Sequence, residues 1–276
     1  MTPDEAAFRH LAALLEQRTG QQIAPNRQWR AETVLKALLK ERGLRDLSAL
    51  TASLLTGRDP GLADQVVEAL LNHETFFFRD VQSFEQLRGG ALTALRTRRA
   101  ASKRLSIWCA GCSTGQEAYS LAIIFADAAP QWRDWSVEIT ATDVSDVALD
   151  QARAGLYSQF EIQRGLPVAS MLRWFDQVGE AWRVKRQLAG QVRFRRHNLL
   201  MAQTGAFDLI LCRNVLLYFS PERRREAFDR LAASLAPDGY LMLGAGETVV
   251  GQTDAFALSP DLRGLYRRAG TAKRVA

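Results

Sequence analysis

The sequence has few of the residues that hold metals or form disulfides. Its 276 residues include three cysteines and three histidines, and an odd, small number of cysteines argues against a disulfide scaffold. Cys109 and Cys112 form a single C-x-x-C pair, without a second pair or suitably spaced histidines, which disfavours a redox or zinc role. We therefore expect no metal site, and the histidines lack the spacing of a catalytic triad.

Signals for membrane insertion and secretion are also missing. No apolar run approaches the roughly 18 to 20 residues that span a membrane. The first residues, M-T-P-D-E-A-A-F-R-H, lack the basic and apolar regions of a secretory signal. These absences predict a cytoplasmic protein without membrane insertion. A chain of 276 residues, 47% of them hydrophobic, can form one substantial core and a smaller domain.

The pattern of apolar residues changes along the chain and predicts two domains. Residues 1–80 are expected to form a helical domain, because helical spacing recurs at 4–18, 29–41, 47–55 and 62–71. A longer helix, about 81–98, is expected to link the domains, so that residues 81–104 form a linker. From 105 to 276 strands and helices alternate, which indicates an α/β domain with a parallel sheet covered on both faces.

The α/β part has six predicted strands and one interruption. The strands are expected at 105–110, 136–142, 192–196, 207–212, 240–243 and 264–267. The segment 157–190 does not fit the alternation, because it is rich in glycine and aromatic residues. We interpret it as an inserted subdomain.

The stretch from Ile107 to Ile124 reads as strand, tight loop and helix, and it predicts a nucleoside site. Gly111 and Gly115 bracket the turn where the first strand ends, and glycine lets a backbone approach a ligand closely. The second strand ends in Asp143, where doubly wound folds hydrogen-bond a ribose. Together these features indicate a nucleoside ligand.

The spacing of this loop narrows the choice of nucleoside. A dinucleotide loop needs G-x-G-x-x-G, whereas the spacing here is G-x-x-x-G, and no Lys-Ser/Thr pair for a triphosphate follows Gly115. Glu117 adds negative charge near the ligand, which favours a ligand with cationic groups such as S-adenosylmethionine. A glycine-rich turn in another kind of α/β domain is the alternative that the loop alone leaves open.

Six blocks of sequence, in order over about residues 65–250, resemble the CheR-type chemotaxis receptor methyltransferases. They read H-E-T-F-F-F-R from His73, I-W-C-A-G-C-S-T-G-Q-E-A-Y-S-L-A from Ile107, A-T-D-V-S-D-V-A-L-D-Q-A-R-A-G-L-Y from Ala141, R-G-L-P from Arg164, N-L-L from Asn198 and C-R-N-V-L-L-Y-F from Cys212. The resemblance implies a Rossmann-like S-adenosylmethionine-dependent methyltransferase domain with an N-terminal helical domain and a small inserted β-subdomain.

The resemblance also implies a reaction and a site. The reaction is methyl esterification of glutamate side chains on the cytoplasmic helices of chemoreceptors, with S-adenosylhomocysteine as product. Arg79 and Tyr218 would lie nearest the transferred methyl group, although each could instead be an ordinary surface or core residue. The residues implied around the cofactor are His73, Thr75, Arg79, Gly111, Glu117, Asp143, Asn198, Leu199, Asn214 and Val215.

The chain departs from the family pattern at three places. His73 stands where the family commonly has asparagine, while Asn72 lies one position earlier; an imidazole can donate a hydrogen bond as an amide does. Gln116 replaces a usual acid, and Ala245 and Gly246 stand where the family often has histidine and serine. None of these changes removes a group that the chemistry requires.

Two other functions are kept as alternatives. A net charge of +6 and a basic isoelectric point suit a nucleic-acid methyltransferase, but the place of its usual N/D-P-P-Y/F motif reads C-R-N-V-L-L-Y-F. No nucleic-acid partner is therefore expected. A non-catalytic module that binds S-adenosylmethionine or receptors is the second alternative. The stretch between Phe175 and Val184 looks short, so tethering to a receptor-tail pentapeptide is expected to be weak or absent.

Overall fold

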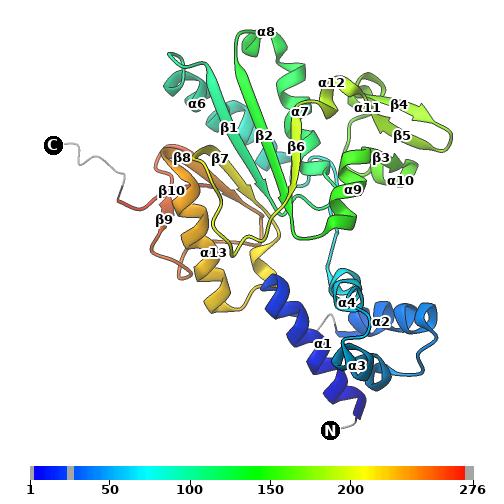
Figure 1. The fold of residues 1–276 in the computed structure, drawn as a ribbon. Coiled ribbons are helices and arrows are strands. Elements are labelled where there is room, and N and C mark those ends of the chain that lie inside the picture. Colours follow the sequence, from blue (N-terminus) through cyan, green and yellow to red (C-terminus); the bar gives the residue numbers. More distant parts are fainter. Residues whose placement is uncertain (1–2, 24–27, 271–276) are drawn as a thin grey trace. The chain divides into compact units, whose positions relative to one another are not determined.

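The computed structural model describes residues 3–23 and 28–270, and the chain divides into two compact units (Figure 1). The N-terminal unit comprises Met1–Asn72 together with Tyr218–Arg223, and the C-terminal unit comprises His73–Leu217 and Arg224–Ala276. The boundary therefore follows residue 72, earlier than the predicted boundary at residue 80. A short segment far along the chain also returns to the N-terminal unit, which the sequence pattern does not reveal.

The N-terminal unit consists of four helices whose bounds agree with the predicted ranges to within one residue. They are α1 (Pro3–Thr19), α2 (Gln28–Arg42), α3 (Leu47–Thr56) and α4 (Leu62–Leu70). Helix α3 begins where the Asp46 side chain accepts a hydrogen bond from the Ala49 N–H at 2.7 Å. The apolar faces of the helices meet in a core formed by Leu11, Leu35, Leu38, Leu39, Leu50, Leu62 and Val66.

The C-terminal unit is built on a seven-stranded sheet with the order β6-β2-β1-β7-β8-β10-β9. The pairs from β6 to β8 are parallel, whereas β10 is antiparallel to both β8 and β9. The prediction of an all-parallel sheet is therefore wrong at this edge, because the connection from β9 to β10 is too short for a crossover. The strands are β1 (Arg104–Ala110), β2 (Ser136–Asp143), β6 (Val192–Arg196), β7 (Phe207–Cys212), β8 (Leu235–Leu243), β9 (Phe256–Leu258) and β10 (Leu265–Arg268).

The strand order reverses at the middle of the sheet, and we call the region outside the carboxyl ends of β1 and β7 the crevice. From β1 the chain moves outward through β2 to β6, and then crosses back to β7 on the other side of β1 (Figure 1). In open α/β sheets, ligands bind outside the carboxyl ends of the strands at such a switch point. The loops after β1 and β7 are therefore the expected place of the site.

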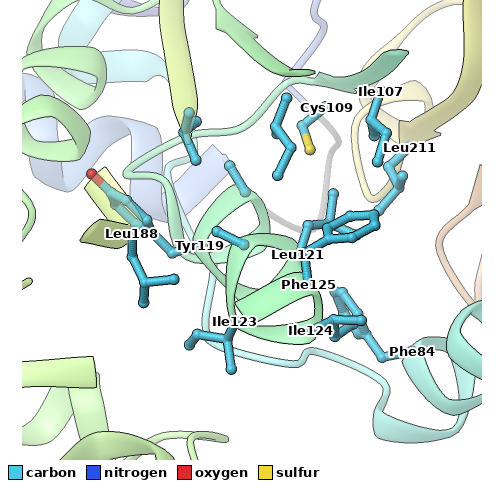
Figure 2. Close-up of a cluster of buried hydrophobic side chains, with 14 of the residues drawn as sticks. Phe84, Ile107, Cys109, Tyr119, Leu121, Ile123, Ile124, Phe125, Leu188 and Leu211 are labelled. Atoms are coloured by element: carbon cyan, nitrogen blue, oxygen red, sulfur yellow. The ribbon is translucent and has the colours of Figure 1, made fainter. Parts of the chain in front are cut away.

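Helix α7 (Gln116–Asp127) forms the centre of the largest core cluster. Ten of its twelve residues are buried, and a helix that is apolar all round belongs inside a core. Figure 2 shows its Leu121 and Phe125 near Ile107 of β1 and Leu211 of β7. This packing fixes the helix that begins directly after the loop of β1.

The predicted linker helix belongs instead to the C-terminal unit. It consists of α5 (Val81–Gln86), the π-helical turn η2 (Leu87–Ala91) and α6 (Leu92–Arg98). Its apolar stripe, which includes Phe84 and Leu95, is buried in the same core as α7. The expectation of an interdomain linker is wrong because this stripe needs a core to cover it. The π-helical turn contains Gly90, where a Cβ atom would lie 2.7 Å from Leu262 Cδ2.

A separate three-stranded antiparallel sheet lies in the segment predicted as an insertion. Its strand order is β3-β5-β4. Its strands and accompanying helices are β3 (Leu156–Ser158), α10 (Gln159–Gln163), α11 (Val168–Trp174), β4 (Phe175–Val178), β5 (Ala181–Val184) and α12 (Arg186–Ala189).

The remaining elements are α8 (Ala129–Trp132), α9 (Asp146–Ala154), η3 (Leu216–Tyr218) and α13 (Pro221–Ser234). Within the described ranges, no helix is long and apolar enough to cross a membrane.

A charged cluster lies near the amino ends of β1, β7 and β8, at the opposite end of these strands from the crevice. Arg99, just after α6, donates from Nε to Asp208 Oδ1 at 2.7 Å and from Nη1 to Asp238 Oδ2 at 2.8 Å. Asp208 Oδ2 also accepts from the Ser106 N–H at 2.8 Å. The hydrogen bonds from Arg99 lower the pKa of Asp238, so this contribution to stability is present at neutral pH and is lost as the pH falls through the lowered value.

We expect Asp208→Asn to destabilise the C-terminal unit by about 2 kcal/mol, because an amide cannot accept from both Arg99 and the Ser106 N–H. Urea unfolding followed by tryptophan fluorescence measures this, since five of the six tryptophans lie in this unit. Asp254→Asn, at an exposed position of the same unit, is the matched control. Equal unfolding midpoints for the two variants would contradict the prediction.

Candidate functional site

The loop after β1 and the loop after β7 are in direct contact at the crevice. The N–H groups of Gly111 and Cys112 both donate to the Thr142 carbonyl at the end of β2, at 2.8 and 2.9 Å. Gly111 has φ 80°, and a Cβ atom there would lie 2.3 Å from Val215 Cγ2. The space that this glycine leaves is thus filled by Val215, which explains why only glycine fits. A contact of the Gly111 backbone with a cofactor stays a prediction.

Asp143 connects the ends of the first two strands. Its Oδ2 accepts from the Ser113 N–H at 2.8 Å and its Oδ1 from the Ser145 N–H at 3.0 Å. Burial raises the pKa of Asp143, and these backbone hydrogen bonds oppose that rise. A carboxylate has about four acceptor sites, which is more than these backbone hydrogen bonds use. The side chain can therefore accept ribose hydroxyls while it holds the loop.

The segment that begins at His73 lies beside this loop. The Ser113 hydroxyl donates to the His73 carbonyl at 2.8 Å, and the charge that His73 can carry acts to lower the pKa of Asp143. Thr75 follows at a half-buried position. The structure thus brings His73 to the predicted ribose residue, although the two are far apart in the sequence.

Two further contacts anchor the same segment. Phe77 is fully buried, and its carbonyl would lie 2.0 Å from a Cβ atom at Gly165, which has φ 87°. The Phe78 N–H donates to the Ser120 hydroxyl of α7 at 2.9 Å. The R-G-L-P block therefore packs against the H-E-T-F-F-F-R block, and glycine is required at the contact.

Arg79 ends this segment with a half-buried side chain. Its Nη1 donates to the Glu74 carbonyl at 3.1 Å, and its guanidinium lies 5.5 Å from the centre of the Phe76 ring. Its charge also acts to lower the pKa of Glu117. Arg79 is thus oriented from its own segment and stands near the first turn of α7.

Glu117 has a partner within the protein that the sequence pattern did not indicate. Arg213, which directly follows β7 and has a side chain that is 1% exposed, donates to Glu117 at 3.0 Å and to Asp80 at 2.7 Å. It also donates to the Arg79 carbonyl at 2.7 Å. Burial raises the pKa of Glu117, and Arg213 opposes that rise. The one signal in the sequence for this ion pair is the position of Arg213 directly after a buried strand, since a buried charge needs carboxylate partners.

Asn198 and Leu199 lie just beyond the end of β6. The Asn198 Oδ1 accepts from the Leu200 N–H at 3.0 Å, and Leu199 is buried. The preceding His197 N–H donates to the Asp143 carbonyl at 2.9 Å. This bond aligns the ends of β2 and β6, so the N-L-L block begins next to Asp143.

Asn214 and Val215 follow β7, and a second carboxylate holds them. Asn214 has φ 60°, a left-handed conformation that costs a non-glycine residue about 1 kcal/mol. Glu247, in the loop after β8, accepts from the N–H groups of Asn214 at 2.7 Å and Val215 at 3.0 Å. Glu247 was not predicted, because its G-A-G-E context does not show that a carboxylate meets backbone N–H groups.

Tyr218 belongs to the N-terminal unit, whereas Arg79 belongs to the C-terminal unit. The Asn72 Nδ2 donates to the Tyr218 hydroxyl at 2.5 Å, and Arg30 of α2 donates to the Asn72 Oδ1 at 2.5 Å. Tyr218 is therefore oriented by residues of its own unit. The predicted convergence of Arg79 and Tyr218 on one reacting group stays a prediction.

The residues at the crevice fit a nucleoside ligand. Asp143 offers lone pairs to a ribose, and the segments after β1, β6 and β7 meet around it through the contacts of Gly111, Val215 and His197. Among the residues that the structure describes, no group of three or more histidine, cysteine or carboxylate side chains could hold a metal. The residues at the crevice provide hydrogen-bonding groups and a defined backbone shape. Arg79 and Glu117 are the charged side chains beside them.

Comparison with known proteins identifies the family. The family model described as "CheR methyltransferase, SAM binding domain" matches residues 73–263. Chemotaxis protein methyltransferase 1 of Pseudomonas aeruginosa is 36% identical over 275 residues, which cover 98% of this chain and 100% of the relative. Chemotaxis protein methyltransferase 1 of Vibrio cholerae is 36% identical over 94% of each chain. The Escherichia coli chemotaxis protein methyltransferase is 31% identical over 93% of this chain and 92% of its own. The chain therefore belongs to the CheR methyltransferase family, and its cofactor is S-adenosylmethionine.

Proposed function

We propose that this protein is a cytoplasmic protein-glutamate O-methyltransferase that esterifies glutamate side chains on the cytoplasmic domains of chemoreceptors during chemotactic adaptation. The observation that carries the proposal is similarity over nearly the whole chain to proteins named chemotaxis protein methyltransferases. The N-terminal helical unit is included in these matches. A shared cofactor domain alone would support only a methyltransferase of unknown substrate.

We assign the cofactor to the crevice between the loops after β1 and β7. S-adenosylmethionine supplies an electrophilic methyl group when it is bound. Asp143 accepts the ribose hydroxyls, and Asn198 and Leu199 lie by the adenine. Asn214 and Val215 line the opposite side. The hydrogen bonds that Asp143 and Glu247 already accept support these assignments, because they hold both loops in place before a ligand enters.

The chemistry asks the protein for alignment rather than for a base. A glutamate carboxylate has a pKa near 4.3 and is ionised at neutral pH, so it attacks a methyl group without a general base. Alignment of the reacting groups is worth at most about 7–11 kcal/mol. Arg79 orients the incoming carboxylate, and Tyr218 helps to fix its position. The hydrogen bonds at Arg79 and Tyr218 support these roles by limiting the freedom of both side chains.

A labelled-methyl transfer assay tests the reaction. The full chain is incubated with labelled S-adenosylmethionine and a chemoreceptor cytoplasmic fragment, and we expect the label to be released by base as methanol, because esters are base-labile. A fragment with its acidic residues changed to amides is the matched control. Base-stable label, or label on duplex DNA or structured RNA instead, would falsify carboxyl esterification; the net charge of +6 makes the nucleic-acid arm informative.

We expect Arg79→Lys to lower kcat by roughly 10- to 100-fold, because an ammonium cannot reproduce the planar, bidentate contact of a guanidinium with a carboxylate. Initial rates on a receptor fragment, at saturating S-adenosylmethionine, measure the effect. Arg88→Lys is the control, since Arg88 is exposed on the π-helical turn of the same unit. Full turnover by the Arg79 variant would remove this residue from the proposed mechanism.

We further propose that tethering to a receptor-tail pentapeptide is weak or absent. An extended peptide can add to a free sheet edge through backbone hydrogen bonds, and β4 is an edge strand of the small sheet. This strand has only four residues, so few such bonds can form. We expect calorimetry with a receptor-tail pentapeptide to give a Kd of about 1 mM or weaker. A micromolar Kd would contradict this.

A further inference from the structure

The carboxylate of Glu247 is surrounded by backbone N–H groups of the loop after β7. Its Oε1 accepts from Val215, Leu216 and Leu217 at 3.0, 2.8 and 3.3 Å, and its Oε2 accepts from Asn214 and Gly244 at 2.7 and 2.9 Å. Four consecutive N–H groups, from 214 to 217, therefore converge on one side chain. A half-buried carboxylate that accepts this many hydrogen bonds differs from an ordinary surface glutamate, whose side chain faces water.

The surrounding backbone is shaped to bring Glu247 to these donors. A Cβ atom at Gly244 would lie 2.9 Å from the Asn214 N and 2.9 Å from the Glu247 Oε2, so only glycine lets the end of β8 approach so closely. The Glu247 N–H donates to the Gly244 carbonyl at 2.9 Å, which closes a turn between them. This turn aims the carboxylate back at the end of β7.

Glu247 also stabilises the left-handed conformation of Asn214, because it accepts from the Asn214 N–H and from the N–H groups that follow. Asn214 has φ 60°, and the N–H groups that follow it point in one direction only while this residue stays left-handed. Val215 is the next residue, and its side chain fills the space at Gly111. The position of Val215 against the loop after β1 therefore depends on the bonds that Glu247 accepts.

The other side of the same loop is held by different groups. The Arg213 side chain pairs with Glu117 and Asp80, which fixes the end of β7 but not the backbone after it. Burial raises the pKa of Glu117, and the nearby charge of Glu247 adds to that rise. The two carboxylates thus have separate tasks, because one binds a side chain and the other binds the backbone.

We propose that Glu247 is a positioning residue for S-adenosylmethionine, which holds Asn214 and Val215 in the conformation that lines the cofactor. The inference rests on the proposed assignment of these two residues to the cofactor. Glu247 itself touches neither the cofactor nor the substrate carboxylate in this role. It acts through five backbone hydrogen bonds, and a carboxylate suits this role because it accepts on both oxygens and carries no donor of its own.

Glu247→Gln tests the proposal with little change in shape. An amide turns an NH₂ donor toward at least two of the five N–H groups, so the loop loses acceptors that it cannot replace. We expect the Kd for S-adenosylhomocysteine, measured by calorimetry on the full chain, to rise about ten-fold or more. We also expect faster hydrogen exchange of the amides at 214–217, with unchanged far-UV circular dichroism. Glu180→Gln, in the exposed turn between β4 and β5, is the matched control.

The outcomes separate this inference from the proposed function. A Kd for Glu247→Gln within two-fold of the Glu180→Gln value would overturn the inference, whatever the esterification assay shows. Asp143→Asn tests the cofactor assignment itself, because it changes the ribose contact and leaves the Glu247 bonds in place. If Glu247→Gln does not fold, hydrogen exchange of the wild-type chain tests the inference instead. Amides at 214–217 that exchange as fast as an unstructured chain, with or without S-adenosylhomocysteine, would also overturn the inference.

Discussion

The buried ion pair between Arg213 and Glu117 is the interaction on which the rest of the crevice depends. Removing one partner of such a pair costs about 3–5 kcal/mol, because the other charge stays buried and unpaired. Arg213 also reaches Asp80 and the Arg79 carbonyl. The end of β7, the first turn of α7 and the segment that carries Arg79 are therefore joined at one guanidinium. Any change that moved α7 or β7 would also move Arg79.

Carboxylate side chains hold the loops of this crevice in place through hydrogen bonds to the backbone. Asp143 accepts backbone N–H groups from the loop after β1 and from the turn after β2, and Glu247 accepts them from the loop after β7. Backbone N–H groups at loops lack the partners of regular structure, so an ionised acceptor stabilises a single conformation. Backbone N–H groups thus offset part of the negative charge that Asp143 and Glu247 bring to the crevice.

Much of the fold could be predicted because it follows from local periodicity. The four N-terminal helices and the strands β1, β2, β6 and β7 have apolar patterns that belong to one kind of element. The positions of Gly111 and Asp143 at the ends of β1 and β2 were predictable for the same reason. The antiparallel β10, the core position of 81–98, Arg213 and Glu247 were not predictable. The structure of each depends on a partner far along the chain, and the local sequence does not indicate which residue that partner is.

Residues 72 and 73, where the chain departs from the family pattern, have partners in different units. The family commonly has asparagine at the place of His73, but here the asparagine is Asn72, and its side chain donates to the Tyr218 hydroxyl. The His73 carbonyl accepts a hydrogen bond from the Ser113 hydroxyl. The charge that its imidazole can carry acts to lower the pKa of Asp143. The boundary between the two units falls between these neighbours. Asn72 thus contacts the tyrosine of the N-terminal unit, and His73 contacts the loop after β1 in the C-terminal unit.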